Sequence, residues 1–378
     1  MEKLEKLMEN YICENCLGRQ YSRLSRGLTN FQRGRILKLL EESKNIGRCY
    51  VCNGFFDGLD KWVDRAERKL KNIEFNSLLV GTKLSKDLIE REERLWEKIG
   101  IENTEPLKAE INREVGKRLG AYFKKPAEFK NPDIVVILNL EKNDVEVKIN
   151  PLFISGYYKK LQRGFPQSKW GTPGKYKTSI EEIIAKPIVK AMRGENQKLH
   201  GAGREDVDAR CLDWRPFVIE ILNAKKRKIN LKQIERSIKK TRKVEVKNLK
   251  FSTMDVVRKI KDAKPDKTYR VLIEFSEHVG NKDLKKLKNL VGMIHQQTPE
   301  RVLHRRADLL RKREVKSIKY KIKNRKAIEL VVRGSAGLYI KELVTGDNSR
   351  TKPSVSELLD VKAVPKELDV IKIEKITL

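Results

Sequence analysis

Two pairs of cysteines constrain the fold of this chain more than any other feature. Cys13 and Cys16 form one Cys-x-x-Cys pair, and Cys49 and Cys52 form the other. Each spacing lets a tight turn present two thiolates to one ion, so the four sulfurs together suit a tetrahedral zinc site. Four thiolates leave no open coordination position, and we therefore expect a structural zinc that organises a module over residues 1–57.

Two other interpretations of these cysteines are disulfide bonds and a thioredoxin-like redox pair. The N-terminus, MEKLEKLMEN, is charged from its second residue and has no apolar signal segment, which disfavours a secreted, disulfide-bonded protein. Two separate pairs are also not typical of a redox motif. We expect the fifth cysteine, Cys211, to be a small buried hydrophobic side chain.

The charge of the chain is large and unevenly distributed. The 378 residues include 84 Lys and Arg against 52 Asp and Glu, for a formal net charge of +32. Residues 1–150 contribute +4 of this, and residues 151–378 contribute +28. Such a surplus suits a polyanionic partner, so we expect a nucleic acid to bind mainly to the C-terminal part.

The absence of common sequence signatures excludes several classes of protein. No apolar run approaches the ~20 residues that a membrane-spanning helix needs, so we expect no membrane partner and a cytoplasmic protein. No phosphate loop, dinucleotide-binding glycine motif or zinc-protease motif is present, and there are only four histidines. A reaction would therefore use carboxylates, Lys, Arg and aromatic side chains, without a nucleotide or other organic cofactor.

Hydrophobic periodicity predicts an α+β fold, with a mixed, mainly antiparallel sheet and flanking helices after residue 155. A polar connector over residues 156–167 would join the two parts. Its neighbouring aromatics Tyr157, Tyr158, Phe165 and Trp170 would either stack on unpaired bases or pack at the domain junction. The expected helices are 30–42, 59–70, 107–119 and 232–243, and the expected strands are 75–80, 134–138, 145–149, 215–222, 269–275, 318–322 and 327–333.

The stretch from Gly201 to Arg210 concentrates groups that could perform chemistry. Asp206 and Asp208 alternate with Val207, so on an extended segment both carboxylates would face one way. A charged surface turn with local ion pairs is the alternative interpretation.

A family resemblance becomes visible at these residues. Gly203-Arg-Glu-Asp206 resembles the Gly-Arg-x-Asp motif of pseudouridine synthases. The longer run to Arg210, followed by Arg215-Pro-Phe217, is similar to the archaeal and eukaryotic tRNA pseudouridine synthases that modify the T loop, the tenth family of these enzymes. Residues 58–155 resemble a THUMP domain, an RNA-binding module. Further similar blocks are Gln296–Val302, Gly337–Leu343 and Gly346–Pro353.

The resemblance implies a catalytic domain over residues 156–378 that isomerises uridine 54, uridine 55 or both in tRNA. Asp206 would be the catalytic carboxylate, Tyr269 would stack on the flipped base, and Lys341 would pair with Asp206 and keep it ionised. The partner would be tRNA, and zinc would be the one bound cofactor. The remaining substrate-binding residues implied are Arg204, Tyr339, Ile340 and Leu343.

Two alternatives keep the RNA-binding half and change the function. One is a THUMP-containing methyltransferase or thiolation enzyme, which would need a glycine-rich cofactor turn or a phosphate loop that the sequence lacks. The other is a non-catalytic tRNA-binding scaffold that uses the basic surface alone.

Overall fold

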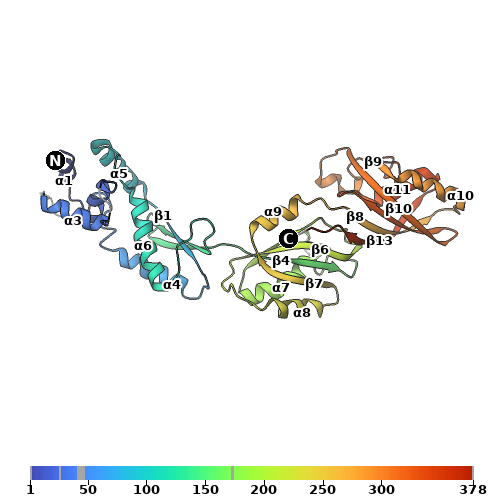
Figure 1. Ribbon diagram of the computed structural model, residues 1–378, viewed down its shortest axis with the longest axis horizontal. Helices are drawn as coiled ribbons and strands as arrows, with labels where there is room; N and C mark the ends of the chain where they lie inside the picture. The colour runs from blue at the N-terminus through green and yellow to red at the C-terminus, as the bar shows by residue number, and fades with distance from the viewer. Residues whose placement is uncertain (1, 25–26, 41–46, 172–173, 377–378) are drawn as a thin grey trace. The chain divides into compact units, whose positions relative to one another are not determined.

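The computed structural model describes residues 2–24, 27–40, 47–171 and 174–376 and divides into two compact units (Figure 1). The first unit comprises Met1–Pro151 with Lys225–Arg227, and the second comprises Leu152–Ala224 with Lys228–Leu378. None of the described helices is both long and apolar enough to cross a bilayer.

A three-stranded sheet with helices forms the first unit. The strand order is β1-β2-β3, with β1 and β2 parallel and β2 and β3 antiparallel. Helix α6 packs on β1 and helix α4 packs on β3. The elements are α1 (Glu2–Met8), α2 (Glu14–Gly18), α3 (Asn30–Leu40), α4 (Leu59–Leu70), β1 (Leu78–Lys83), α5 (Lys86–Ile99), α6 (Leu107–Phe123), β2 (Ile134–Asn139) and β3 (Asp144–Ile149).

The cysteine-containing segment and the sheet share one hydrophobic core. That core runs from Leu4 and the four paired cysteines through α4 and α6 to Val145. Gly18 and Gly34 let the backbones of α2 and α3 touch, since a Cβ at either glycine would lie 1.8 Å from a carbonyl oxygen of the other helix. The cysteine segment is therefore packed into the first unit and does not form a separate core.

A mixed, mainly antiparallel ten-stranded sheet organises the second unit, which confirms the expected fold class. Its order is β12-β9-β10-β11-β8-β13-β6-β4-β7, with β5 on β6, and only β6 and β13 are parallel among the described strand neighbours. The strands are β4 (Leu152–Lys160), β5 (Asn196–Gly201), β6 (Ala209–Leu222), β7 (Val244–Ser252), β8 (Lys267–Phe275), β9 (Gly292–Gln296), β10 (Arg311–Asn324), β11 (Ala327–Gly334), β12 (Thr351–Lys352) and β13 (Ala363–Ile373).

Two groups of helices cover separate halves of this sheet. Helices α7 (Ile180–Met192) and α8 (Leu231–Lys239) bury one core against β4, β6 and β7 (Figure 1). Short helices bury the other core against β8, β10 and β11. The remaining helices are α9 (Met254–Asp262), α10 (Asn281–Leu284), α11 (Ile340–Thr345) and α12 (Val355–Leu359), and the 3-10 turns are η1 (Arg19–Tyr21), η2 (Lys285–Leu290) and η3 (Glu300–Arg305).

The start of the expected polar connector is instead a central strand. Strand β4 pairs with β6 on one side and β7 on the other, and Tyr158 and Lys160 at its end are fully buried. Phe165, in the loop that follows, is also buried. The hypothesis that Tyr158 and Phe165 stack on RNA bases is therefore wrong, because both rings belong to the interior.

One carboxylate joins the two halves of the sheet. The strand register places Asp369 on β13 opposite both Arg210 on β6 and Arg270 on β8. Arg210 donates to its two oxygens at 2.9 and 2.8 Å, Arg270 donates at 2.9 Å, and Arg163 lies at 2.7 Å. Burial would raise the pKa of Asp369, but the hydrogen bonds from Arg210 and Arg270 outweigh it and lower that pKa to about 2.

We predict that Asp369→Asn lowers the free energy of unfolding of the second unit by about 2 kcal/mol at pH 7, because three guanidinium groups lose their shared anion. A depressed folded-state pKa stabilises the protein above the unfolded value of about 3.9, and this contribution is lost as the pH falls toward about 2. Urea unfolding at several pH values tests this. The exposed Asp360→Asn variant is the control, and a difference that persists unchanged at pH 2 contradicts the prediction.

Candidate active site

A cavity of about 870 Å³ lies in the second unit where the turn before β6, the start of β8, the 3-10 turn η3 and the start of α11 converge. It brings together six expected side chains: Arg204, Asp206, Tyr269, Tyr339, Ile340 and Lys341. Leu343 does not line the cavity, because it is fully buried in the core behind α11. Leu368 and Val370 of β13, which the sequence analysis missed, form part of the wall.

Two cations hold the Asp206 carboxylate. Arg301 Nη2 lies 3.2 Å from Oδ2, and Nη1 donates to Oδ1 at 3.3 Å. Lys341 Nζ lies 3.5 Å from Oδ2. One third of the Asp206 side chain remains exposed, so the carboxylate is clamped by positive charge and still reachable from the cavity.

Lys341 is shared between two carboxylates, and its shorter contacts are with Asp208. Its Nζ donates to both Asp208 oxygens at 2.7 Å. Partial burial opposes ionisation of Asp208, but the hydrogen bond from Lys341 outweighs it and lowers the pKa of Asp208. The expected pairing of Lys341 with Asp206 is thus present as the longer of two contacts.

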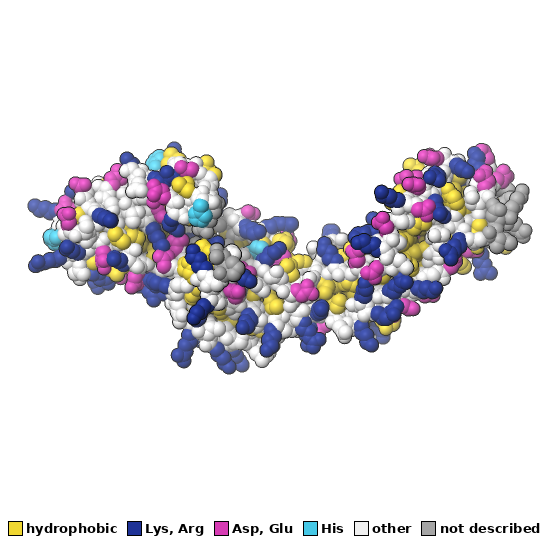
Figure 2. All heavy atoms as spheres, turned by 180° about the vertical axis from the view of Figure 1, so that it is seen from behind, with side chains coloured by type: hydrophobic (Ala, Val, Ile, Leu, Met, Phe, Trp, Pro, Cys, Tyr) yellow, Lys and Arg dark blue, Asp and Glu magenta, His cyan; other side chains and the backbone are white. Residues whose placement is uncertain are grey.

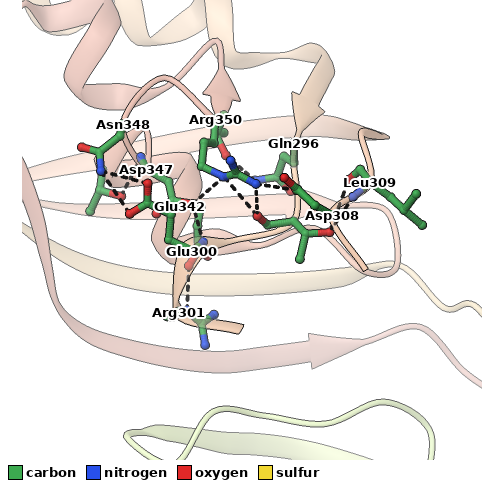
Figure 3. A network of polar contacts seen from close by, with 12 residues as sticks. Gln296, Glu300, Arg301, Asp308, Leu309, Glu342, Asp347, Asn348 and Arg350 are labelled. Atoms are coloured by element: carbon green, nitrogen blue, oxygen red, sulfur yellow. Dashed lines mark hydrogen bonds and ion pairs between the residues drawn. The ribbon is translucent and has the colours of Figure 1, made fainter. Parts of the chain in front are cut away.

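Arg301 is positioned by a network of polar contacts from distant segments (Figure 3). Its Nε donates to Glu342 Oε1 at 2.7 Å, and Glu342 in α11 is almost fully buried. Asn348 donates to Glu300, the neighbour of Arg301, and Arg350 donates to the carbonyl oxygen of Thr298 at 2.9 Å. Arg301 lies in the Gln296–Val302 block, but the sequence analysis did not single out this arginine as a site residue.

Buried donors fix the turn that carries Asp206. Lys160 Nζ donates to the carbonyl oxygens of Asp206 at 3.1 Å and Val207 at 2.8 Å. Gln167 donates to the carbonyl oxygen of Gly203 at 2.9 Å, and Arg215 donates to that of Ala202 at 2.8 Å. Because these donors are buried, the backbone of the turn is held from the protein interior while Asp206 and Asp208 face the cavity.

An ion pair completes this network under the turn. Glu205, buried at 5% exposure, lies 3.2 Å from Arg215 Nε and accepts a hydrogen bond from the Tyr158 hydroxyl at 3.1 Å. Gln167 donates to that hydroxyl at 2.8 Å. Glu205 therefore points into the protein and Asp206 points out, which separates a structural carboxylate from a candidate catalytic one.

The two tyrosines of the cavity have different surroundings. The ring of Tyr269 forms part of the cavity wall. Burial raises the pKa of Tyr269 to about 12, so its hydroxyl stays neutral. The Tyr339 hydroxyl accepts a hydrogen bond from Arg306 at 2.7 Å. Its backbone N–H and carbonyl group both bond the side chain of Gln296 at 2.9 Å, which fixes the start of α11.

The four paired cysteines form a second candidate site, in the first unit. Their sulfur atoms lie within 4.8 Å of one another, and Cys13 Sγ and Cys52 Sγ are 3.7 Å apart. A tetrahedron with Zn–S distances of ~2.3 Å has sulfur–sulfur edges of about 3.8 Å. The cluster could therefore hold a metal ion. Cys211 is fully buried among apolar residues, as expected, and burial raises the pKa of its thiol to about 11.

A buried arginine fits the charge of such a cluster. Arg19 is fully buried, and its Nη1 donates to Glu92 and to the carbonyl oxygen of Glu105. Its Nε and Nη2 have no hydrogen-bond partner among the described residues, while its charge interacts with Cys16. Four thiolates around a divalent cation carry two negative charges, which these unpartnered N–H groups complement.

Comparison with known proteins agrees with this organisation. The family model described as "Pus10, C-terminal" matches residues 153–374, and "Pus10 THUMP domain, archaeal" matches residues 62–139. The tRNA pseudouridine synthase Pus10 of Methanothrix thermoacetophila is 40% identical over 96% of this chain and 91% of its own length. That of Pyrococcus furiosus is 38% identical over 99% of this chain and 97% of its own.

Solved structures show weaker similarity. A Cbf5–Nop10–Gar1 complex matches 57% of this chain and 48% of the matched chain, at 19% identity and a TM-score of 0.35. A pseudouridylate synthase matches 62% of this chain and 71% of its own, at 15% identity and a TM-score of 0.23.

The fold is that of the pseudouridine synthase class, with a THUMP domain as its accessory part. The chain belongs to the Pus10 family of tRNA pseudouridine synthases, which confirms the family expected from the sequence.

We predict that Lys160→Met loosens the turn from Gly203 to Asp208, since two partly buried carbonyl oxygens lose their donor at a cost of about 1–3 kcal/mol. Hydrogen exchange of the turn amides should become faster, with little change in α8. Lys159→Met, one residue earlier and not buried, is the matched control. Unchanged hydrogen exchange in Lys160→Met would show that the turn keeps its conformation without the hydrogen bonds from Lys160.

Proposed function

We propose that this chain is an isomerase that converts uridine 54, uridine 55 or both in the T loop of tRNA to pseudouridine, with Asp206 as the catalytic carboxylate. The observation that carries the proposal is the Asp206 carboxylate in the basic cavity, held by Arg301 and Lys341. Both a nucleophile and a base need a carboxylate that the substrate can reach, and one third of the Asp206 side chain is exposed in the cavity.

The reaction separates and rejoins two parts of one nucleotide. The C1′–N1 bond breaks, the uracil rotates within the cavity, and a C5–C1′ bond forms as the C5 proton leaves and N1 gains a proton. Product and substrate have the same atoms, so no organic cofactor is consumed. A target base in a loop is also easier to unstack than one in a duplex.

Each wall of the cavity has a separate task in this proposal. The Tyr269 ring stacks on the flipped uracil, and Ile340 and Leu368 form the apolar side. Tyr339, fixed by Arg306 and Gln296, orients the nucleotide. The exposed Arg204 at the turn fills the gap that the flipped base leaves, and Leu343 supports Ile340 from the core.

Charge supports tRNA as the partner. The C-terminal 228 residues carry +28, and Lys and Arg side chains project widely from the surface in Figure 2. Exposed lysines along α8 and β10 would contact phosphates, whose neutralisation releases counterions. We place the protein in the cytoplasm, where this partner is modified.

Asp206→Asn should abolish pseudouridine formation, a loss of at least ~10³-fold, because the amide can be neither nucleophile nor base. The assay uses an unmodified tRNA transcript without any cofactor, followed by carbodiimide treatment and primer extension. The stops also show which T-loop uridines react. Asp255→Asn, an exposed carboxylate on α9, is the control. Product from Asp206→Asn removes the role of Asp206, and no product from the wild type favours a scaffold.

We propose further that Cys13, Cys16, Cys49 and Cys52 bind one structural zinc ion. Because their segment shares a core with the sheet of the first unit, the metal would stabilise that whole unit. The ion would supply folding free energy and no reaction step.

Removal of zinc by a strong chelator should therefore unfold much of residues 1–151 and leave the second unit folded. Mass spectrometry should give one zinc per chain, and limited proteolysis after chelation should yield a fragment that starts near residue 152. A chain that contains no metal, or that stays intact after the metal is stripped, contradicts the proposal. Cys211→Ser is the control, since this thiol lies outside the cluster.

A further inference from the structure

Two lysines of the second unit are buried, and they differ in their partners. Lys160, at 0% exposure, donates to two carbonyl oxygens. Lys267, at 8% exposure, makes no hydrogen bond or ion pair from Nζ to any residue that the structure describes. Burial of most of this side chain weakens the solvation of its charge, and no carboxylate offsets that loss, so Lys267 is expected to lower the stability of the fold.

The Lys267 side chain lines the same cavity as Asp206. It lies two residues before Tyr269 on β8, so the two side chains point to the same face of the strand. Gly203, at a φ of +87°, makes room for it, since a Cβ there would lie 2.5 Å from Lys267 Nζ. A larger residue at this point of the Gly203–Asp206 motif would displace the ammonium.

Neighbouring charges leave Lys267 available for an anion. Arg215 approaches from β6 and is already engaged by Glu205 and the Ala202 carbonyl oxygen. Burial and the charge of Arg215 lower the pKa of Lys267 to about 8, against smaller opposing effects of Cys211 and Glu205. The ammonium form still prevails at pH 7.

The other cations close to Asp206 are occupied. Arg301 holds Asp206 and Glu342, and Lys341 holds Asp206 and Asp208. The charges of Arg301 and Lys341 are therefore already balanced by carboxylates. Lys267 is the buried cation of the cavity, among the described residues, that has no anion of its own.

The proposed reaction creates one anion at this position. When the C1′–N1 bond breaks heterolytically, its electron pair stays on the uracil and is shared between N1 and the ring oxygens. We propose that Lys267 is a catalytic residue whose ammonium group binds the departing uracil anion beside Tyr269. The inference rests on the proposed function and deepens it. When C5 then bonds to C1′ and loses its proton, N1 gains a proton and the anion disappears.

The test compares single-turnover cleavage of the C1′–N1 bond in tRNA that carries uridine or 5-fluorouridine at the target position. Lys267→Met should slow cleavage by about 10²-fold with uridine, which is typical of the loss of one donor to a developing anion. The loss should be several-fold smaller with 5-fluorouridine, because fluorine stabilises the uracil anion without the enzyme. Lys267→Arg should recover part of the rate, and tRNA affinity should change less than threefold.

Stability gives an independent measurement. Met replaces the unpaired ammonium with an apolar side chain of similar length, so Lys267→Met should melt at the same or a higher temperature than the wild type. Lys264→Met, which removes an exposed cation three residues away, is the matched control for a general loss of charge.

The outcomes separate the two proposals. An inactive wild type overturns the proposed function. An active wild type with equal losses on both substrates, with no loss, or with a markedly less stable Lys267→Met variant overturns the role of Lys267, because the amine would then act in folding or positioning.

Discussion

The chemistry of this protein depends on how one short turn is attached to the interior. The segment from Ala202 to Val207 lies at the surface of the cavity, yet four of its carbonyl oxygens accept hydrogen bonds from the buried side chains of Lys160, Gln167 and Arg215. These donors come from β4, the loop after it and β6. Hydrogen bonds from buried or charged donors are strong and costly to break. We therefore expect the turn to keep its position when a base binds in the cavity.

The proposed reaction requires two charged groups of opposite sign in one cavity, a carboxylate and a cation that do not pair with each other. In the proposed reaction the Asp206 carboxylate must be held in place and stay reachable, and Arg301 and Lys341 contact it from segments about 95 and 135 residues away from it in sequence. The proposed uracil anion needs a cation that is not already paired, and among the described residues Lys267 is the buried cation of the cavity without an anion. Among the described residues of the cavity, the structure therefore keeps one buried ammonium unpaired beside the paired Arg301 and Lys341, which is the kind of local instability that functional sites carry.

The sequence predicted well wherever the signal was local. The Cys-x-x-Cys pairs, the two expected strands that correspond to β10 and β11 and the expected helix 107–119 each depend on residues close together in the chain. Prediction failed for residues 156–160, because the buried face of this strand carries Gly156 and Lys160, so burial alternates along the strand without a matching alternation of apolar residues. The polar Lys160 at its end also reads as solvent-exposed, although the fold supplies two carbonyl acceptors for it.

The sequence by itself determined the family, the carboxylate at Asp206 and the tetracysteine set, since motif spacing and residue chemistry are written along the chain. Only the tertiary structure decided which cations meet which carboxylates. In the structure Arg301 is the nearer of the two cations that contact Asp206, and Lys341 lies closer to Asp208 than to Asp206. Lys267 has no anionic partner among the described residues. Coulomb attraction between two charged side chains depends on the distance between them. For strands and turns that are far apart in sequence, only the fold determines that distance.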